Sequence, residues 1–225
     1  MIRYFLILTS CFALWACGQP KQSDKVTGLT IDKNIKREVE KYIQNSKQFE
    51  PLADKMQIYE NSVFVESYEN DSLAFKSGRN PNKQLFKSFY LYKQLFESFY
   101  LWKRGMLTID GAFGLFGGIG FAIKIDKNKA ALYHLLSSDD FPSYAYNKSD
   151  SLQFRLEVPC RDTKIILSEI PDSTKKQIIY GYVEFKSSFY YEAGNEVNKK
   201  ETSSRVKRKD NMKIYFKSSW LALKD

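Results

Sequence analysis

Two stretches of the sequence indicate the fold: FYLWKRGMLTID, residues 99–110, and GFAIKIDKNKAALYHLL, residues 120–136. Each contains two runs rich in aromatic, β-branched and leucine side chains, and a short polar segment separates the runs, at 103–105 in the first stretch and 126–129 in the second. Short apolar runs separated by turn residues are typical of antiparallel hairpins. We therefore predict a meander of strands that begins near residue 98.

The same pattern extends to both sides of these stretches. Further strands are expected at 62–67, 72–76, 143–146, 152–158, 164–168, 178–191 and 212–217. Many short strands with turn residues at nearly regular spacing indicate an antiparallel sandwich or a barrel-like meander. The fold class is therefore mainly β, and we expect one globular domain over residues 31–225.

One or two helices precede the strands. Residues 32–48 place apolar side chains at helical spacing, and Asp32 is the candidate N-cap. The apolar face of this helix is formed by Ile35, Val39, Tyr42 and Ile43. A shorter helical segment is expected around residues 52–59, after Pro51.

A tandem repeat lies between the helices and the meander. KQLFKSFYLY, residues 83–92, is followed at once by KQLFESFYLW, residues 93–102. A period of ten residues returns to the same face of a strand, yet the apolar residues also form a helical stripe. Residues 83–97 are therefore compatible with either helix or strand, and two copies are too few for a solenoid.

Composition limits the chemistry of the chain. Its 225 residues are 43% apolar and 16% aromatic, and they carry a formal net charge of +9. Disorder, collagen and a multi-span membrane protein are excluded. With one His and three Cys, a His-rich metal site is excluded and a Cys cluster nearly so. We expect no metal and no cofactor.

The first residues indicate export. Arg3 precedes an apolar run of thirteen residues, 4–16, which is too short to span a bilayer comfortably. The run ends in Leu14, Trp15, Ala16, Cys17 and Gly18, a segment that resembles the lipobox of exported bacterial lipoproteins.

This resemblance implies a signal peptide over residues 1–16, which is cut before Cys17, and a lipid-modified Cys17, as in palmitate-carrying lipoproteins. Residues 17–30 would be a polar tether. The implied location is the cell envelope, lipid-anchored, at the outer membrane of a Gram-negative bacterium. Because Cys11 would leave with the signal, only Cys160 would remain as a free thiol, and no internal disulfide could form.

The most unusual polar segment follows residue 194. Seven basic and three acidic residues lie between 194 and 213, and we expect a loop there. Thr, Ser and Val are the main spacers, so we also expect that the chain cannot neutralise all of these charges itself. The candidate residues for binding an anionic surface are Lys199, Lys200, Arg205, Lys207, Arg208 and Lys209. Export argues against nucleic acid as the partner and leaves anionic lipid or acidic glycan.

The sequence signals for a catalytic or carboxylate site are weaker. Cys160 and His134 form the one conceivable thiol and imidazole pair, but neither has a flanking signature, so we expect a structural His in a strand and a buried Cys at a strand end. Carboxylates at Asp126, Asp139, Asp140, Glu157 and Asp162 match neither an EF-hand nor a glycosidase pattern.

The sequence thus predicts a lipid-anchored envelope protein with a non-catalytic binding or interaction role and no identifiable catalytic residue. One alternative is a lipocalin-like carrier, in which strands from about 98 to 217 enclose a cavity lined by Phe, Tyr and Ile. The other alternative is an envelope enzyme that uses Cys160 with His134, or the carboxylates.

Overall fold

The computed structural model describes residues 27–46, 63–76, 96–113, 118–194 and 204–221, most of which lie in strands. The prediction of a mainly β fold is confirmed, with one helix among these residues. The second helical segment, at 52–59, and almost all of the ambiguous repeat, up to residue 95, lie outside the described residues. No helix in the described ranges is long and apolar enough to cross a membrane.

The elements run in chain order as follows: β1 (Thr30–Ile31), α1 (Ile35–Ser46), β2 (Val63–Glu69), β3 (Ser72–Lys76), β4 (Phe96–Lys103), β5 (Met106–Phe113), β6 (Gly118–Asp126), β7 (Lys129–Ser137), β8 (Tyr144–Ala145), β9 (Arg155–Leu167), β10 (Ile178–Ser187), β11 (Tyr190–Glu192) and β12 (Val206–Trp220).

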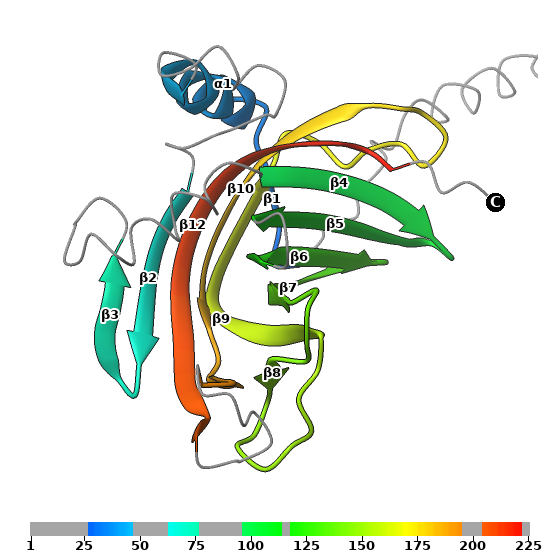
Figure 1. Ribbon diagram of the computed structural model, residues 1–225. Coiled ribbons are helices and arrows are strands. Elements are labelled where there is room, and N and C mark those ends of the chain that lie inside the picture. Colours follow the sequence, from blue (N-terminus) through cyan, green and yellow to red (C-terminus); the bar gives the residue numbers. More distant parts are fainter. Residues whose placement is uncertain (1–26, 47–62, 77–95, 114–117, 195–203, 222–225) are drawn as a thin grey trace, which may run out of the picture.

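The meander predicted near residue 98 is present as β4, β5, β6 and β7, which pair in that order and are all antiparallel (Figure 1). Arg104 and Gly105 connect β4 to β5, with φ angles of 52° and 80°. Two-residue hairpin turns favour such left-handed backbone because its twist matches that of the strands. The short polar segments of the sequence therefore mark the turns correctly.

Strand β9 differs from the prediction. Residues 152–158 and 164–168 were expected as two strands, but one continuous strand runs from Arg155 to Leu167. Its first half pairs with β7 and its second half with β10. The register against β10 shifts near Asp162, whose φ is 49°, as expected for a bulge. The bulge accommodates the polar residues within the strand, so that one bent strand pairs with both β7 and β10.

Two other boundaries also differ. The strand expected at 178–191 is divided into β10 and β11. The strand expected at 212–217 extends in both directions to become β12, the longest strand of the molecule's described part. Strand β12 has several partners: β10 and β11 along one edge, and β2 and β4 along the other. A strand with neighbours on both sides satisfies its backbone groups even where its side chains are poor strand formers.

The pairings close into a ring. Strands β4, β5, β6, β7, β9, β10 and β12 are each paired with the next, and a short parallel contact of β12 with β4 completes the circle. Ser219 lies opposite Phe99 and Trp220 opposite Tyr100 in this contact. With β1 on β9, it is one of two parallel pairings between the labelled strands of the described residues, and the other strand pairs of this barrel-like sheet are antiparallel.

The interior of the ring is packed with side chains from all sides. Tyr100, Phe121 and Phe216 are fully buried, and the rings of Phe121 and Phe216 lie 4.8 Å apart. Gly120 brings β6 and β5 close together, because a Cβ at this position would collide with the carbonyl oxygen of Gly111. Phe, Tyr and Ile side chains contribute most of the buried hydrophobic cluster inside the ring.

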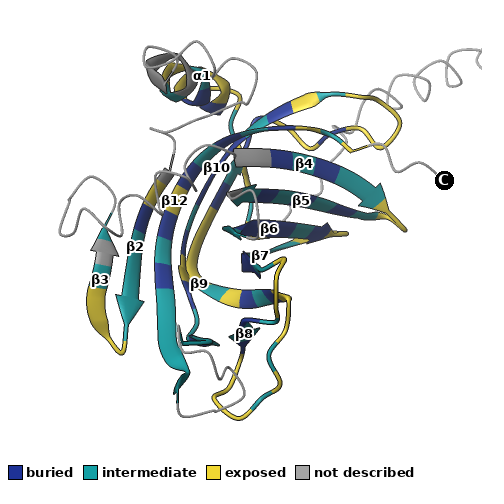
Figure 2. Ribbon diagram, in the orientation of Figure 1, coloured by how far each residue is buried: buried dark blue, intermediate teal, exposed yellow. Residues whose placement is uncertain are grey.

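Helix α1 lies on the outer face of the sheet, over β9, β10 and β12 (Figures 1 and 2). Ile35 and Val39 are buried there, as their spacing predicts. Tyr42 stacks on Tyr215 of β12, with ring centroids 4.3 Å apart. The helix begins at Ile35, later than expected, and a turn precedes it. In this turn Asp32 Oδ1 accepts a hydrogen bond from the Asn34 amide, and the Asp32 carbonyl oxygen accepts one from the Ile35 amide.

Candidate functional site

The basic segment predicted as a loop is largely a strand. Residues 206–213 belong to β12, and the neighbours of this strand account for the difference. Lys199 and Lys200 lie outside the described residues. Arg205 directly precedes the strand, and its guanidinium donates hydrogen bonds to the carbonyl oxygens of Lys148 and Asp150.

Strand alternation divides the remaining basic residues between two faces. Arg208 lies on the face of the buried Asp210, where it contacts Glu69 at 3.1 Å and Glu192 at 2.9 Å. Burial raises the pKa of Glu192, although Arg208 opposes this effect. Arg208 therefore holds strands together and is a poor candidate for surface binding.

Lys207 and Lys209 point to the outer face and share one partner. Both contact the carboxylate of Asp71, at 3.1 and 3.5 Å. Asp71 lies in the turn between β2 and β3, and the lysine contacts lower its pKa. Each of the three basic residues 207–209 thus lies beside an acidic side chain, but Lys207 and Lys209 share the single carboxylate of Asp71, so their two charges are not both neutralised by it.

Positive charge still predominates on the outer face of β9, β10, β12, β2 and β3 where α1 does not cover it. We call this area the basic face. Its basic side chains are Lys76, Arg161, Lys164, Lys186, Lys207, Lys209 and Lys213, and its acidic side chains are Glu66, Asp71, Asp162 and Glu184. The seven basic and four acidic groups leave an excess of three positive charges, contributed by segments far apart in the sequence.

Aromatic rings lie between the lysines of the basic face. The ammonium of Lys207 is 3.8 Å from the ring centroid of Phe189, and that of Lys209 is 4.9 Å from the ring of Tyr68. Such contacts hold flexible lysine side chains in place over the rings. Phe64 is 42% exposed on the same face.

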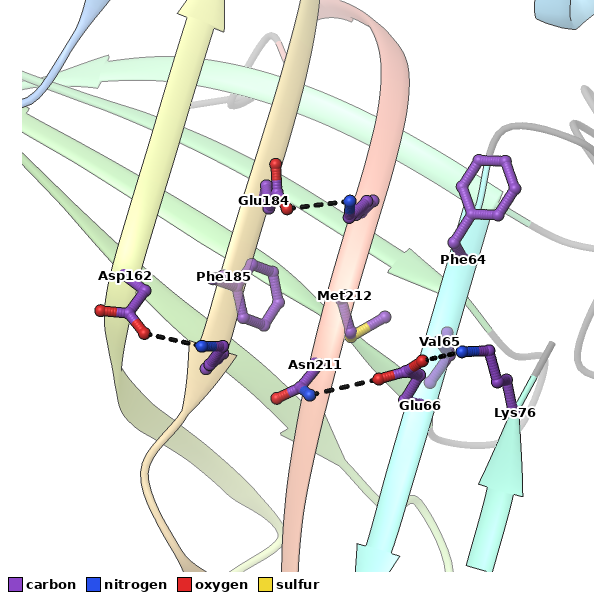
Figure 3. A pocket seen from close by; sticks show the side chains of 11 residues that line it. Phe64, Val65, Glu66, Lys76, Asp162, Glu184, Phe185, Asn211 and Met212 are labelled. Carbon is purple, nitrogen blue, oxygen red and sulfur yellow. Dashed lines mark hydrogen bonds and ion pairs between the residues drawn. The ribbon is translucent and has the colours of Figure 1, made fainter. Parts of the chain in front are cut away.

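A groove of about 500 Å³ crosses the basic face (Figure 3). Three ion pairs lie around it: Glu66 with Lys76, Asp162 with Lys186, and Glu184 with Lys213. Asn211 lies among them and donates a hydrogen bond of 3.4 Å to Glu66. The contacts with Lys76 and Lys186 lower the pKa values of Glu66 and Asp162, so both carboxylates are ionised near neutral pH.

The opposite face of β12 carries a buried polar cluster around Asp210, a residue that the sequence reasoning did not single out. The Asp210 carboxylate accepts hydrogen bonds from His134 Nε2 at 2.9 Å, from the Tyr190 hydroxyl at 2.7 Å and from Ser67. Burial raises the pKa of Asp210, but the hydrogen bonds from His134, Ser67 and Tyr190 outweigh it, so the pKa lies below its ordinary value.

His134 is the structural His that the sequence predicts. It is fully buried, and its Nδ1 lies 2.9 Å from the carbonyl oxygen of Gly120. Both ring nitrogens therefore face acceptors, and both hydrogen bonds form when the ring carries two protons. The pair of His134 and Asp210 is then a buried ion pair between β7 and β12.

Cys160 does not form a catalytic pair with His134. It lies within β9 and not at a strand end as expected, since the bend and the bulge continue the strand past it. Its thiol donates to the carbonyl oxygen of Val158 at 3.6 Å, and burial raises its pKa to about 12. Both ring nitrogens of His134 are bonded elsewhere, so neither is free to accept the thiol proton.

The candidate carboxylates are not brought together. Asp139 and Asp140 are exposed in a loop, Asp126 is exposed at a turn, Glu157 contacts Lys124, and Asp162 contacts Lys186. In the part of the chain that the structure describes, no three His, Cys, Asp or Glu side chains are grouped so that they could hold a metal ion.

The basic face and its groove are therefore the candidate site for binding, and the Asp210 cluster is its internal support. No protein-family model matches this chain, and no curated protein and no solved structure matches it either.

Proposed function

We propose that this chain is a lipid-anchored protein of the cell envelope whose basic face binds an acidic glycan, without catalysis. The lipobox-like segment from Leu14 to Cys17 supports the anchor and the location. The observation that carries the binding role is the gathering of seven basic side chains, from four strands, beside the exposed ring of Phe64 and the half-buried rings of Phe189 and Tyr68.

An acidic glycan fits this surface better than a lipid headgroup layer does. The lysines are interleaved with rings, and the apolar C–H face of a sugar ring loses water when it lies on an aromatic side chain. Carboxylates of the same face, such as Glu66 and Glu184, would oppose a dense anionic membrane but can accept hydrogen bonds from sugar hydroxyls.

Binding of polygalacturonate by the full-length protein in non-ionic detergent tests the proposal. Substitution of Lys186, Lys207, Lys209 and Lys213 by Gln should abolish most binding at low salt, because several weak, screened contacts act together. The matched control replaces four exposed lysines outside the basic face, Lys103, Lys127, Lys129 and Lys175, by Gln.

The control variant loses the same charge and should retain most of the binding. Equal loss in both variants would show that net charge alone attracts the polymer and would contradict a specific binding face. Tighter binding to anionic vesicles than to polygalacturonate would assign the face to lipid instead.

A further inference from the structure

The groove on the basic face combines hydrogen-bond donors and acceptors within a small area. Lys76, Lys186 and Lys213 donate, and the carboxylates paired with them accept. Its volume of about 500 Å³ lies within the range of about 300–1,000 Å³ that is usual for small-molecule sites. The groove therefore has the size and the polarity of a site for a hydroxylated ligand.

Asn211 lies at the centre of this arrangement (Figure 3). Its amide group donates to Glu66 through a long hydrogen bond of 3.4 Å. An amide has two donor hydrogens and one acceptor oxygen, so its second N–H and its carbonyl oxygen are left for a ligand. The neighbours of Asn211 along β12, Asp210 and Met212, are buried on the opposite face, which fixes the direction of the amide.

An apolar surface lies at the rim. Phe64 is on β2 opposite Lys213, is 42% exposed and packs edge-on against Tyr42 of α1, with ring centroids 6.3 Å apart. The contact with Tyr42 holds one edge of the ring and leaves area for a ligand. An aromatic ring beside an amide and carboxylates suits a sugar ring, which has an apolar face and a hydroxylated edge.

The three carboxylates also select against other anions. A polyanion without hydroxyl groups would offer no side-group donors to Glu66, Asp162 and Glu184, and like charges at short range repel. A hydroxylated anion would donate to these carboxylates while its own carboxylate contacts the lysines.

From these contacts we propose that the groove is the subsite that recognises a uronic-acid unit of an acidic glycan, with Asn211 bonded to its hydroxyls and Phe64 beneath its ring. This inference rests on the proposed function. It adds that the groove recognises the hydroxyl groups and the ring of the sugar as well as its negative charge.

The test compares two polymers of equal charge and length, polygalacturonate and poly-L-glutamate, on the full-length protein in non-ionic detergent. The wild-type protein should bind polygalacturonate more tightly. Asn211→Leu and Phe64→Ala should each weaken polygalacturonate binding by about tenfold, the loss expected for one or two good contacts, and leave poly-L-glutamate binding unchanged. Phe64 is partly exposed, so Phe64→Ala remains informative if Asn211→Leu fails to fold.

Two results overturn the inference in distinguishable ways. Equal affinity of the wild-type protein for both polymers, or equal loss for both in the groove variants, would overturn the groove as a sugar subsite and leave the basic face intact. Failure of both polymers to bind would overturn the proposed function, and the subsite with it.

Discussion

Replacing His134 by Phe should destabilise the protein strongly, because the change leaves a buried carboxylate without its counter-charge. Asp210 is 2% exposed, and its Oδ2 accepts from His134 at 2.9 Å and from Tyr190 at 2.7 Å. Phe preserves most of the ring volume, so the loss is chiefly electrostatic. Removing one partner of such a pair costs about 3–5 kcal/mol.

The expected change is measurable by urea denaturation and by thermal unfolding. For a chain of this length, each kcal/mol lowers Tm by about 2–4 °C, so Tm should fall by about 6–20 °C. Asp210→Asn should cost less than His134→Phe, since the amide keeps the shape of the carboxylate, its oxygen can still accept a hydrogen bond from Tyr190, and its NH2 group can donate one to the Ser67 hydroxyl.

A double variant separates charge pairing from packing. His134→Phe combined with Asp210→Leu removes both charged partners, and this double variant should be less destabilised than the sum of His134→Phe alone and Asp210→Leu alone, because no unpaired charge is left inside. Strict additivity of the two changes, or a His134→Phe variant within about 1 kcal/mol of the parent, would refute the assignment of a buried ion pair.

Three further outcomes follow from the same structure. The pKa of Asp210 is lower in the folded state than in the unfolded chain, so its contribution to stability is complete above the unfolded-state value of about 4 and is lost as the pH falls through the folded-state pKa. The free energy of unfolding should therefore depend less on pH at acid pH in Asp210→Asn than in the parent, and an unchanged dependence would contradict this. The pKa of Cys160, about 12, predicts slow alkylation by iodoacetamide at pH 8 in the native protein and rapid alkylation in urea; equal rates would show an exposed thiol. Cys17→Ser should abolish incorporation of labelled palmitate in a bacterial host, and persistent labelling would place the lipid elsewhere.

Two hairpins of the meander, β4 with β5 and β6 with β7, were predictable because the residues of each turn favour a turn by themselves. Positions 103–105 and 126–129 combine polar residues with Gly or Asn, and strands flank them on both sides. The bend in β9 was not predictable, since polar residues 161–163 are typical of a loop and only the pairing with β10 through a bulge keeps them in a strand. Local patterns thus define hairpins but not the partners of a bent strand.

The candidate site was predictable only in part. The excess of positive charge near residue 205 is evident in the sequence, but its division into an inward Arg208 and outward Lys207 and Lys209 depends on the strand that carries them. Asp210 gave no signal, because its partners His134, Tyr190 and Ser67 are between 20 and 143 positions away along the chain. Buried polar clusters of this kind are assembled by topology.

The closure of the ring by β12 and β4 sets the order of events in folding. Residues 99 and 100 can pair with residues 219 and 220 only after the C-terminal strand β12 has been synthesised, and β12 is also a neighbour of β2, β10 and β11. Contacts between residues far apart along a chain form slowly, because a long loop has to be ordered first. During synthesis the hairpins of the meander can form early, but their sheet keeps open edges until the last strand emerges. A chain that stops before residue 206 would keep those edges permanently, and open strand edges promote aggregation.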